Sequence, residues 1–331
     1  MNGLEVYLGL DVGSVSVNLV LLDEKYNVLE KFYLRTQGRP IEVVKEGMEM
    51  MYRSMPAGCI IAGVGATGSG RELAGAMVDA DVVKNEITAH GMAVLQSIPG
   101  AQTILEIGGQ DSKIILLRNG VVSDFAMNTV CAAGTGSFLD RQAARLGIPI
   151  QEFGALALKS TSPVRIAGRC AVFAESDMIH KQQMGCSLED IIKGLCEALV
   201  RNYLNNVGKG KEILPDIVFQ GGVAANEGIK RSFEDALGQR VIVPEHYDVM
   251  GAIGAAILAH KKIRQGYTTR FRGFDSIHSD FTARSFSCSG CANLCEVVEL
   301  SSAGSVKARW GDRCGKWSSS AARENHADIL A

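Results

Sequence analysis

Two stretches of the chain share one pattern, in which an apolar strand ends in an acid and a glycine turn, and a second apolar strand follows. Residues 6–22 read VYLGLDVGSVSVNLVLL, and residues 103–117 read TILEIGGQDSKIILL. Asp11 and Glu106 take equivalent places, and a glycine follows each of them two residues later. Two ordinary hairpins could explain either stretch alone, but the repeat favours two related lobes built on the same plan.

The acids and glycines of these turns suit the binding of phosphate and magnesium. Backbone N–H groups of a glycine turn form an anion-binding concavity, and carboxylates can hold Mg²⁺ through its water molecules. By analogy with phosphoryl-transfer sites, Gln110 and Asp111 are candidates to position an attacking water. The predicted catalytic residues are Asp11, Glu106, Gln110 and Asp111, and the predicted phosphate contacts are Gly13, Ser14, Ser16, Gly108 and Gly109.

A third glycine motif joins a predicted strand to a predicted helix in residues 217–237, IVFQGGVAANEGIKRSFEDAL. Adjacent glycines let the backbone approach a flat ring or a phosphate closely, and asparagine is a typical helix cap. The further candidates for nucleotide binding are therefore Gly221, Gly222, Val223 and Asn226.

A literal GxGxxG occurs at Gly63, Gly65 and Gly68, with Glu86 about where a ribose-binding acid would lie. This dinucleotide-loop interpretation carries little weight, because the chain contains 37 glycines and the unit does not open the protein.

The stretch from residue 128 to residue 147, NTVCAAGTGSFLDRQAARLG, predicts a helix over residues 135–146 that Gly147 ends. Cys131 stands just before this helix, whose N-terminus favours thiolates and other anions. It is a candidate metal or cluster ligand, with Gly134, Thr135 and Gly136 as cofactor contacts, although a small buried cysteine in a turn is the alternative.

The other cysteines fall into two groups. Cys170 lies 39 positions beyond Cys131, so these two residues form no local chelate. Near the C-terminus, Cys288-x2-Cys291-x3-Cys295 is followed after eighteen residues by Cys314. Four cysteines so spaced predict a site for Zn²⁺ or an iron–sulfur cluster, with structural thiols as the alternative.

Composition narrows the class of protein. The formal net charge of −2 favours neither nucleic acid nor membrane as a partner. The start, MNGLEVYLGLD, lacks a basic stretch and is interrupted by an acid, so we expect neither a signal peptide nor an anchor. Nine cysteines without an export signal favour reduced thiols or metal ligands in the cytoplasm.

The chain is long enough for two lobes and an extension. We expect residues 1–100 with 250–264 to form the first lobe, and residues 101–249 the second. Residues 85–97 and 248–260 are predicted to be helices that connect them. Residues 265–331 would form a cysteine-rich C-terminal extension, with a mobile end over the last fifteen residues.

The order of these motifs resembles the actin, sugar kinase and heat-shock chaperone ATPase superfamily. LGLDVGS is similar to its first phosphate motif, LEIGGQD to its second, and FQGGVAAN to its adenosine motif. The resemblance covers roughly residues 5–260. It implies ATP as the nucleotide and a two-lobed α/β fold of the actin and sugar-kinase (ribonuclease H-like) type, here with the cysteine-rich extension.

Two segments narrow the resemblance. NTVCAAGTGSFLD and AGRCAVFAESDMIH closely resemble the ATP-dependent activators of 2-hydroxyacyl-CoA dehydratases, of the BadF/BadG/BcrA/BcrD type, and the related benzoyl-CoA reductase ATPase subunits. In that family two subunits share one [4Fe-4S] cluster, and its ligand positions match Cys131 and Cys170. The segment SCSGCANLC departs from the short activators.

The resemblance implies a homodimer that couples ATP hydrolysis to electron transfer under anaerobic conditions. One electron would pass from a ferredoxin or flavodoxin to an iron–sulfur partner enzyme of the dehydratase or reductase type.

Two other classes of protein stay open. A small-molecule kinase of the same superfamily would need a hydroxyl-binding pocket and a general base, but neither Cys131 nor Cys170. A metal-binding regulatory module would use the cysteine-rich extension as its functional part.

Overall fold

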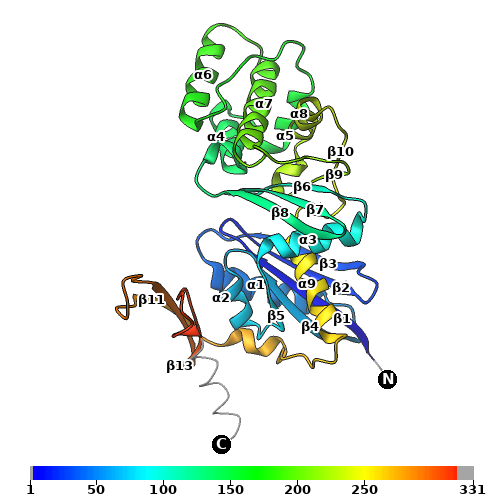
Figure 1. The fold of residues 1–331 in the computed structure, drawn as a ribbon, viewed down its shortest axis with the longest axis vertical. Helices are drawn as coiled ribbons and strands as arrows, with labels where there is room; N and C mark the ends of the chain where they lie inside the picture. The colour runs from blue at the N-terminus through cyan, green and yellow to red at the C-terminus, as the bar shows by residue number, and fades with distance from the viewer. Residues whose placement is uncertain (1–2, 319–331) are drawn as a thin grey trace, which may run out of the picture. The chain divides into compact units, whose positions relative to one another are not determined.

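The computed structural model describes residues 3–318 and has the α/β fold class that the sequence predicts (Figure 1). It divides into two compact units, one formed within residues 1–89 and 251–331 and the other by residues 90–250. Each unit contains a mixed five-stranded sheet that includes one copy of the repeated hairpin. Two helices contain the boundaries, α3 (Glu86–Ser97) and α9 (Met250–Ile263), whereas the sequence placed the first boundary at residue 100.

The sheet of the first unit has the strand order β3-β2-β1-β4-β5. Its repeat hairpin, β1 and β2, is antiparallel, while β4 runs parallel to β1. The elements of this unit are β1 (Leu4–Val12), β2 (Ser16–Asp23), β3 (Val28–Arg35), α1 (Pro40–Ser54), β4 (Cys59–Thr67), α2 (Arg71–Met77) and β5 (Val82–Val83).

Glycines in β1 and β4 allow the backbone of α9 to pack very close to the sheet. A Cβ on Gly9 would lie 1.9 Å from the carbonyl oxygen of Ala252, and one on Gly65 would lie 2.0 Å from that of Ala255. Gly63 and Gly65 therefore lie inside β4 and serve helix packing, so the dinucleotide-loop interpretation of the GxGxxG is wrong.

The sheet of the second unit has the order β10-β9-β6-β7-β8, and β6 and β7 form the second copy of the hairpin. Its strands are β6 (Thr103–Ile107), β7 (Ser112–Arg118), β8 (Val121–Asn128), β9 (Ile217–Gln220) and β10 (Val241–Ile242). Its helices are η1 (Ala132–Gly134), α4 (Gly136–Leu146), α5 (Ile150–Ala157), α6 (Ala171–Gln183), α7 (Leu188–Asn206), η2 (Gly222–Ala225) and α8 (Glu227–Leu237).

The helix predicted after Cys131 is confirmed. Thr135 is the N-cap of α4, and Gly147 ends the helix in the left-handed conformation at φ 70°. Phe138, Leu139 and Ala143 of this helix are buried in the apolar core of the unit.

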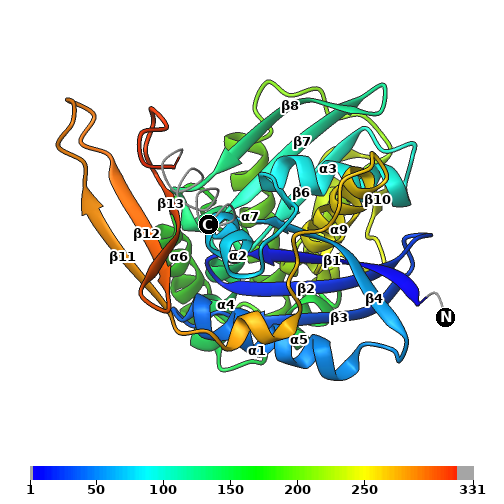
Figure 2. The same ribbon diagram turned by 90° about the horizontal axis from the view of Figure 1, so that it is seen from below.

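The C-terminal extension contains η3 (Phe274–His278) and a three-stranded antiparallel sheet of β11 (Phe281–Ser287), β12 (Glu296–Ser302) and β13 (Ser305–Trp310) (Figure 2). This sheet packs on the first unit, because the buried Leu300 belongs to the core cluster of that unit. The segment leading to it is held by Asp81, which accepts the backbone N–H of Arg270 at 2.7 Å and the hydroxyl of Thr269 at 2.8 Å. Of the segment predicted to be mobile, residues 319–331 lie outside the described residues.

Candidate functional site

The first turn joins β1 to β2. Gly13 donates its N–H to the carbonyl oxygen of Ser16 at 2.9 Å and so closes the turn. Ser14 is exposed at its tip, and Thr36 donates its N–H to the carbonyl of Val15 at 2.8 Å. The predicted phosphate contacts of this turn therefore lie on one short, braced loop.

Asp11 lies in a corner made by glycines and buried polar side chains. A Cβ on Gly68 would lie 2.5 Å from Asp11 Oδ1, and one on Gly251 would lie 2.1 Å from Oδ2. Asn18 and Thr67 are the strand neighbours of Asp11, and their side-chain oxygens are buried with no hydrogen-bond partner among the described residues. Such atoms are costly unless a ligand or water satisfies them, so the corner fits a hydrated cation.

The second turn brings both predicted acids around a lysine. Lys113 Nζ lies 2.9 Å from Glu106 Oε2 and 3.0 Å from Asp111 Oδ2. The side chains of Lys113 and Glu106 are almost fully buried, whereas that of Asp111 is one-third exposed. Gly108 closes the turn by donating its N–H to the carbonyl of Asp111 at 3.1 Å, and Gln110 is exposed at the tip.

A buried polar network adjoins Glu106. The amide nitrogen of Gln220, the strand neighbour of Glu106, lies 2.8 Å from His90 Nδ1 and must donate to it. Burial, followed by the nearby charge of Lys113, lowers the pKa of His90 to about 3, so its ring is neutral near pH 7. Gln220 Oε1 and Ser112 Oγ are buried with no hydrogen-bond partner among the residues described.

The third glycine motif forms the turn between β9 and α8. Gly221 has φ +89°, and a Cβ on it would lie 2.7 Å from Glu106 Oε1, so only glycine lets this turn approach Glu106 so closely. Beside it Gly222 is exposed and Val223 is buried. Asn226 caps α8, as predicted, by accepting a backbone N–H of the helix at 3.1 Å.

Two backbone hydrogen bonds join the second turn to the start of α4. Gly136 donates its N–H to the carbonyl of Gly108 at 2.9 Å, and Ser137 donates its N–H to the carbonyl of Gly109 at 2.8 Å. The hydroxyl of Ser137 also donates to Gly109. The turn therefore satisfies N–H groups that a helix start normally leaves open.

The residues between Cys131 and α4 form a compact loop. Gly134 and Thr135 are buried, and their N–H groups donate to the carbonyls of Cys131 at 3.5 Å and Ala132 at 3.1 Å. Asn128 holds the start of the loop, because its Oδ1 accepts the Cys131 N–H at 2.9 Å.

Cys131 and Cys170 lie on neighbouring loops despite their separation in sequence. Cys131 Sγ lies 3.8 Å from the carbonyl oxygen of Arg169, the residue before Cys170. Asn202 of α7 ties the two loops together, since its Nδ2 lies 2.6 Å from the carbonyl of Gly168 and 3.7 Å from Cys131 Sγ. Both thiols are partly exposed, and Cys170 is the N-cap of α6.

This pair of cysteines fits half of a four-thiolate cluster. Among residues 3–318, no three or more His, Cys, Asp or Glu side chains form a group that could hold a metal ion. Cys131 and Cys170 are two thiols, so a four-thiolate cluster at this position would need a second pair of ligands.

The helices that follow these cysteines, α4 and α6, are joined to each other and flanked by apolar side chains. Glu175 of α6 lies 3.1 Å from Arg141 and 3.0 Å from Arg145 of α4. Next to the cysteines in sequence, the exposed apolar side chains are Val130 at 94%, Val172 at 67% and Phe173 at 66%. Exposed apolar groups beside partly exposed thiols are typical of an interaction surface.

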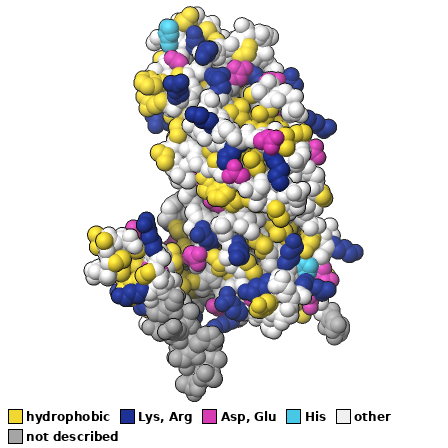
Figure 3. Space-filling view, in the orientation of Figure 1, with side chains coloured by type: hydrophobic (Ala, Val, Ile, Leu, Met, Phe, Trp, Pro, Cys, Tyr) yellow, Lys and Arg dark blue, Asp and Glu magenta, His cyan; other side chains and the backbone are white. Residues whose placement is uncertain are grey.

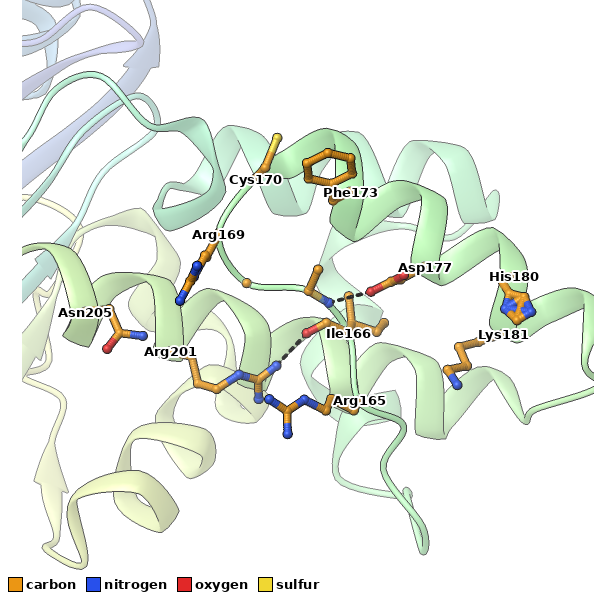
Figure 4. Close-up of a pocket in the computed structure, with 12 residues that line it drawn as sticks. Arg165, Ile166, Arg169, Cys170, Phe173, Asp177, His180, Lys181, Arg201 and Asn205 are labelled. Atoms are coloured by element: carbon orange, nitrogen blue, oxygen red, sulfur yellow. Dashed lines mark hydrogen bonds between the residues drawn. The ribbon is translucent and has the colours of Figure 1, made fainter.

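A cationic pocket of about 890 Å³ adjoins the Cys170 loop (Figure 4). Its polar lining includes the basic residues Arg165, Arg169, Lys181 and Arg201, together with His180 and Asp177. The one acid is engaged, because Asp177 Oδ2 accepts the N–H of Ala167 at 2.8 Å. Figure 4 shows the Cys170 side chain pointing away from Arg165 and Arg201, so the thiol lies at the rim. Figure 3 shows Lys and Arg beside hydrophobic side chains over the region of α6.

The four C-terminal cysteines lie in loops beyond the strands of the small sheet. Cys288 is buried, Cys295 is half-buried, and Cys291 and Cys314 are exposed. The adjacent indole N–H of Trp317 and the backbone N–H of Gly290 hold the pKa of the Cys288 thiol below its usual value.

Sequence reasoning missed three residues at these sites. Lys113 stands in an apolar strand, where one lysine gives no sign of pairing with two acids. Asn202 reaches Cys131 across 71 positions of sequence, and His90 pairs with Gln220 across 130 positions. Only a three-dimensional contact identifies them.

None of the helices in the described part of the chain is both long and apolar enough to cross a membrane.

Comparison with known proteins finds one family. The profile of the BadF/BadG/BcrA/BcrD ATPase family matches residues 8–259. The (R)-2-hydroxyglutaryl-CoA dehydratase activating ATPase of Acidaminococcus fermentans is 35% identical over 264 residues, covering 77% of this chain and 97% of that protein. The 2-hydroxyisocaproyl-CoA dehydratase activator of Clostridioides difficile is 32% identical over 260 residues, covering 78% and 96%.

Solved structures agree with this match. The A. fermentans dehydratase component A superposes with a TM-score of 0.71 at 32% identity, covering 78% of this chain and 99% of that one. The C. difficile activator with bound ADPNP superposes with a TM-score of 0.70 at 31% identity, covering 79% and 96%. The predicted ATPase fold is confirmed, with the three-stranded sheet as an addition.

Proposed function

Because the chain belongs to the BadF/BadG/BcrA/BcrD ATPase family, we propose that it is an ATP-driven activator of an iron–sulfur enzyme of the 2-hydroxyacyl-CoA dehydratase type. In this role ATP is hydrolysed to ADP and phosphate, and one electron leaves a reduced donor protein and arrives at the partner enzyme. The observation that carries the proposal is the short contact between the Cys131 thiol and the Arg169–Cys170 loop, at 3.8 Å.

We assign nucleotide contacts to the three glycine motifs, one of which lies in the first unit and two in the second. We assign the phosphates to the N–H groups of the turns at Gly13 and Gly108, and the adenosine to the exposed backbone around Gly222. Asp11 is assigned to the water shell of Mg²⁺, and the buried oxygens of Asn18 and Thr67 support this assignment because they need a partner.

The second turn is assigned to hydrolysis. Gln110 and Asp111 would position the water that attacks the terminal phosphorus. Lys113 holds the carboxylates of Glu106 and Asp111 in place, since it lies within 3.0 Å of both. The ammonium group thus fixes two acids that would otherwise repel each other and the nucleotide.

The cluster site is assigned to Cys131 and Cys170 of two copies of the chain. A symmetric dimer supplies four thiolates, and a [4Fe-4S] cluster held by them provides one-electron redox chemistry. The exposed Val130, Val172 and Phe173 support a covered surface around these cysteines. We place the activity in an anaerobic cytoplasm, where thiols stay reduced.

The reduced donor is assigned to the cationic pocket beside Cys170. Arg165, Arg169 and Lys181 have no ion-pair partner among the described residues, so they can pair with acids of another protein. Ferredoxins and flavodoxins that present acidic surfaces match this charge, and such complementarity speeds encounter.

The test is activation of a dehydratase in the absence of oxygen. Protein purified without oxygen, reduced ferredoxin and Mg²⁺-ATP should together activate a 2-hydroxyacyl-CoA dehydratase, and omission of ATP should abolish the effect. Phosphorylation of a sugar hydroxyl without electron transfer would instead establish the kinase alternative.

A further inference from the structure

The loop between β11 and β12 brings three cysteines to one end of the small sheet. Ser287, the last residue of β11, pairs with Glu296, the first residue of β12. Cys288 then donates its N–H to the carbonyl of Cys295 at 2.8 Å. These two cysteines close the base of the β11–β12 loop, and Cys291 lies within that loop.

β13 delivers the fourth cysteine to the same end. Trp310, at the end of β13, pairs with Val298 near the start of β12. The chain then passes close to β12, since a Cβ on Gly311 would lie 2.3 Å from the carbonyl oxygen of Glu296. Cys314 follows three residues later.

The loop around Cys314 is packed on the β11–β12 loop. The ring of Trp317 stacks edge to face on Phe286 of β11, with 5.0 Å between the ring centroids. Lys316 Nζ would lie 3.5 Å from a Cβ on Gly290. Side chains next to Cys314 therefore contact the loop that carries the other cysteines.

We propose that Cys288, Cys291, Cys295 and Cys314 bind one thiolate-liganded metal, separate from the site of Cys131 and Cys170. A Cys-x2-Cys pair in one loop, completed by cysteines from neighbouring chain, is the usual arrangement for Zn²⁺ or an iron–sulfur centre. The positive charges of Arg313 and Lys316 offset the negative charge of four thiolates.

Metal binding requires a local rearrangement. In residues 3–318 the thiols are not already gathered as a group of three or more at metal-binding spacing. Cys291 and Cys314 are exposed, so the metal would draw these two loop thiols toward the buried Cys288. The bound metal would then stabilise this end of the sheet. The middle of the sheet is already held by Glu299, which lies within 2.7 Å of both Arg284 and Arg309.

The test uses point substitutions in the full chain, because deletion of the extension would remove Leu300 from the core of the first unit. The parent protein carries Cys131→Ser and Cys170→Ser, which removes the other thiolate site. It is supplied either with Zn²⁺ or with Fe²⁺ and sulfide, without oxygen, and metal per chain is then measured by elemental analysis.

The parent should retain metal after desalting. We expect either about one zinc per chain after supply with Zn²⁺, or iron with labile sulfide after supply with Fe²⁺ and sulfide. Comparison of the two preparations shows which metal the site binds. Adding Cys291→Ser and Cys314→Ser should remove nearly all of it. Adding Cys59→Ser and Cys186→Ser instead should leave the metal content unchanged.

A second readout is titration with Co²⁺, which should produce the visible absorption of a cobalt–thiolate centre in the parent and in the Cys59/Cys186 control only. Unchanged nucleotide binding shows that a variant is folded. Equal metal content with and without Cys291 and Cys314, or no metal in the parent in either arm, overturns the proposal. Neither readout depends on dehydratase activation, so its outcome is independent of the proposed function.

Discussion

Gly136 donates its backbone N–H to the carbonyl oxygen of Gly108 at 2.9 Å, which joins the turn between β6 and β7 to the helix that follows Cys131. The neighbouring bond from Ser137 to Gly109 makes this a double connection within one unit. A change in the turn on hydrolysis would therefore move the start of α4, and with it the loop of Cys131.

Gly136→Ala should uncouple ATP hydrolysis from electron transfer. A Cβ at this position would lie 3.0 Å from the carbonyl oxygen of Gly108 and 3.1 Å from Val223 Cγ2, so the turn and the helix must separate slightly. We expect electrons delivered per ATP to fall on the order of tenfold, because small misplacements are costly in such sites. Both rates are measured on one preparation. Asp140→Ala, on the exposed side of α4, is the control. A variant with the ratio of the unaltered protein would argue against the connection.

Lys113→Met should destabilise the second unit strongly. The substitution keeps the apolar stem but removes the cation beside the buried Glu106, and breaking a buried pair in this way costs about 3–5 kcal/mol. Lys211→Met removes the more exposed pair with Asp124 and should cost much less, because solvent screens a surface pair. Denaturant unfolding compares the two, and equal losses of stability would show that Lys113 is not a structural cation.

His90 should make stability fall as the pH decreases. Its pKa is about 3 in the folded protein and near its ordinary value of 6.5 in the unfolded chain. Between these values the unfolded chain binds more protons, so the free energy of unfolding decreases from pH 6.5 downward, by up to about 1.4 kcal/mol per pH unit.

His90→Gln removes this titration. The difference in unfolding free energy between the unaltered protein and the variant should therefore shrink as the pH is lowered from about 7.5 to about 5. Parallel stability curves over this range would mean that His90 accepts a proton in the folded state.

Reversal of charge in the pocket beside Cys170 should weaken use of an acidic donor. Arg169→Glu and Lys181→Glu should each raise the KM for reduced ferredoxin several-fold and flatten its dependence on salt, while the rate of ATP hydrolysis stays the same. Lys159→Glu, at an exposed position outside the pocket lining, is the matched control. If the KM changed equally in all three variants, the change would be explained by the net charge of the protein and not by a docking site at the pocket.

The sequence predicts those features that depend on residues close together in the chain. The bounds of α4 follow from apolar spacing and from Gly147, and the cap of α8 follows from Asn226, which accepts a helix N–H group at 3.1 Å. The two hairpins follow from their shared pattern of strands, acids and glycines.

Features that depend on distant contacts could not be predicted in this way. Gly63 and Gly65 match a loop motif in sequence, yet they lie in β4 and allow α9 to pack closely on it. No residue near them in sequence indicates this helix. The cysteine-rich extension has a linker-like composition at its start, but Asp81 and the core around Leu300 hold it on the first unit.

The central claim is that Cys131 and Cys170 of two chains hold one cluster, and iron content tests it most directly. The protein is prepared without oxygen and carries Cys291→Ser and Cys314→Ser, so that the extension contributes no iron. With Cys59→Ser added as a control, we expect about four irons for every two chains and a dimer in sedimentation. Cys131→Ser or Cys170→Ser should lose the iron and weaken the dimer while ATP still binds. A Cys131→Ser protein with as much iron as the control would contradict the account.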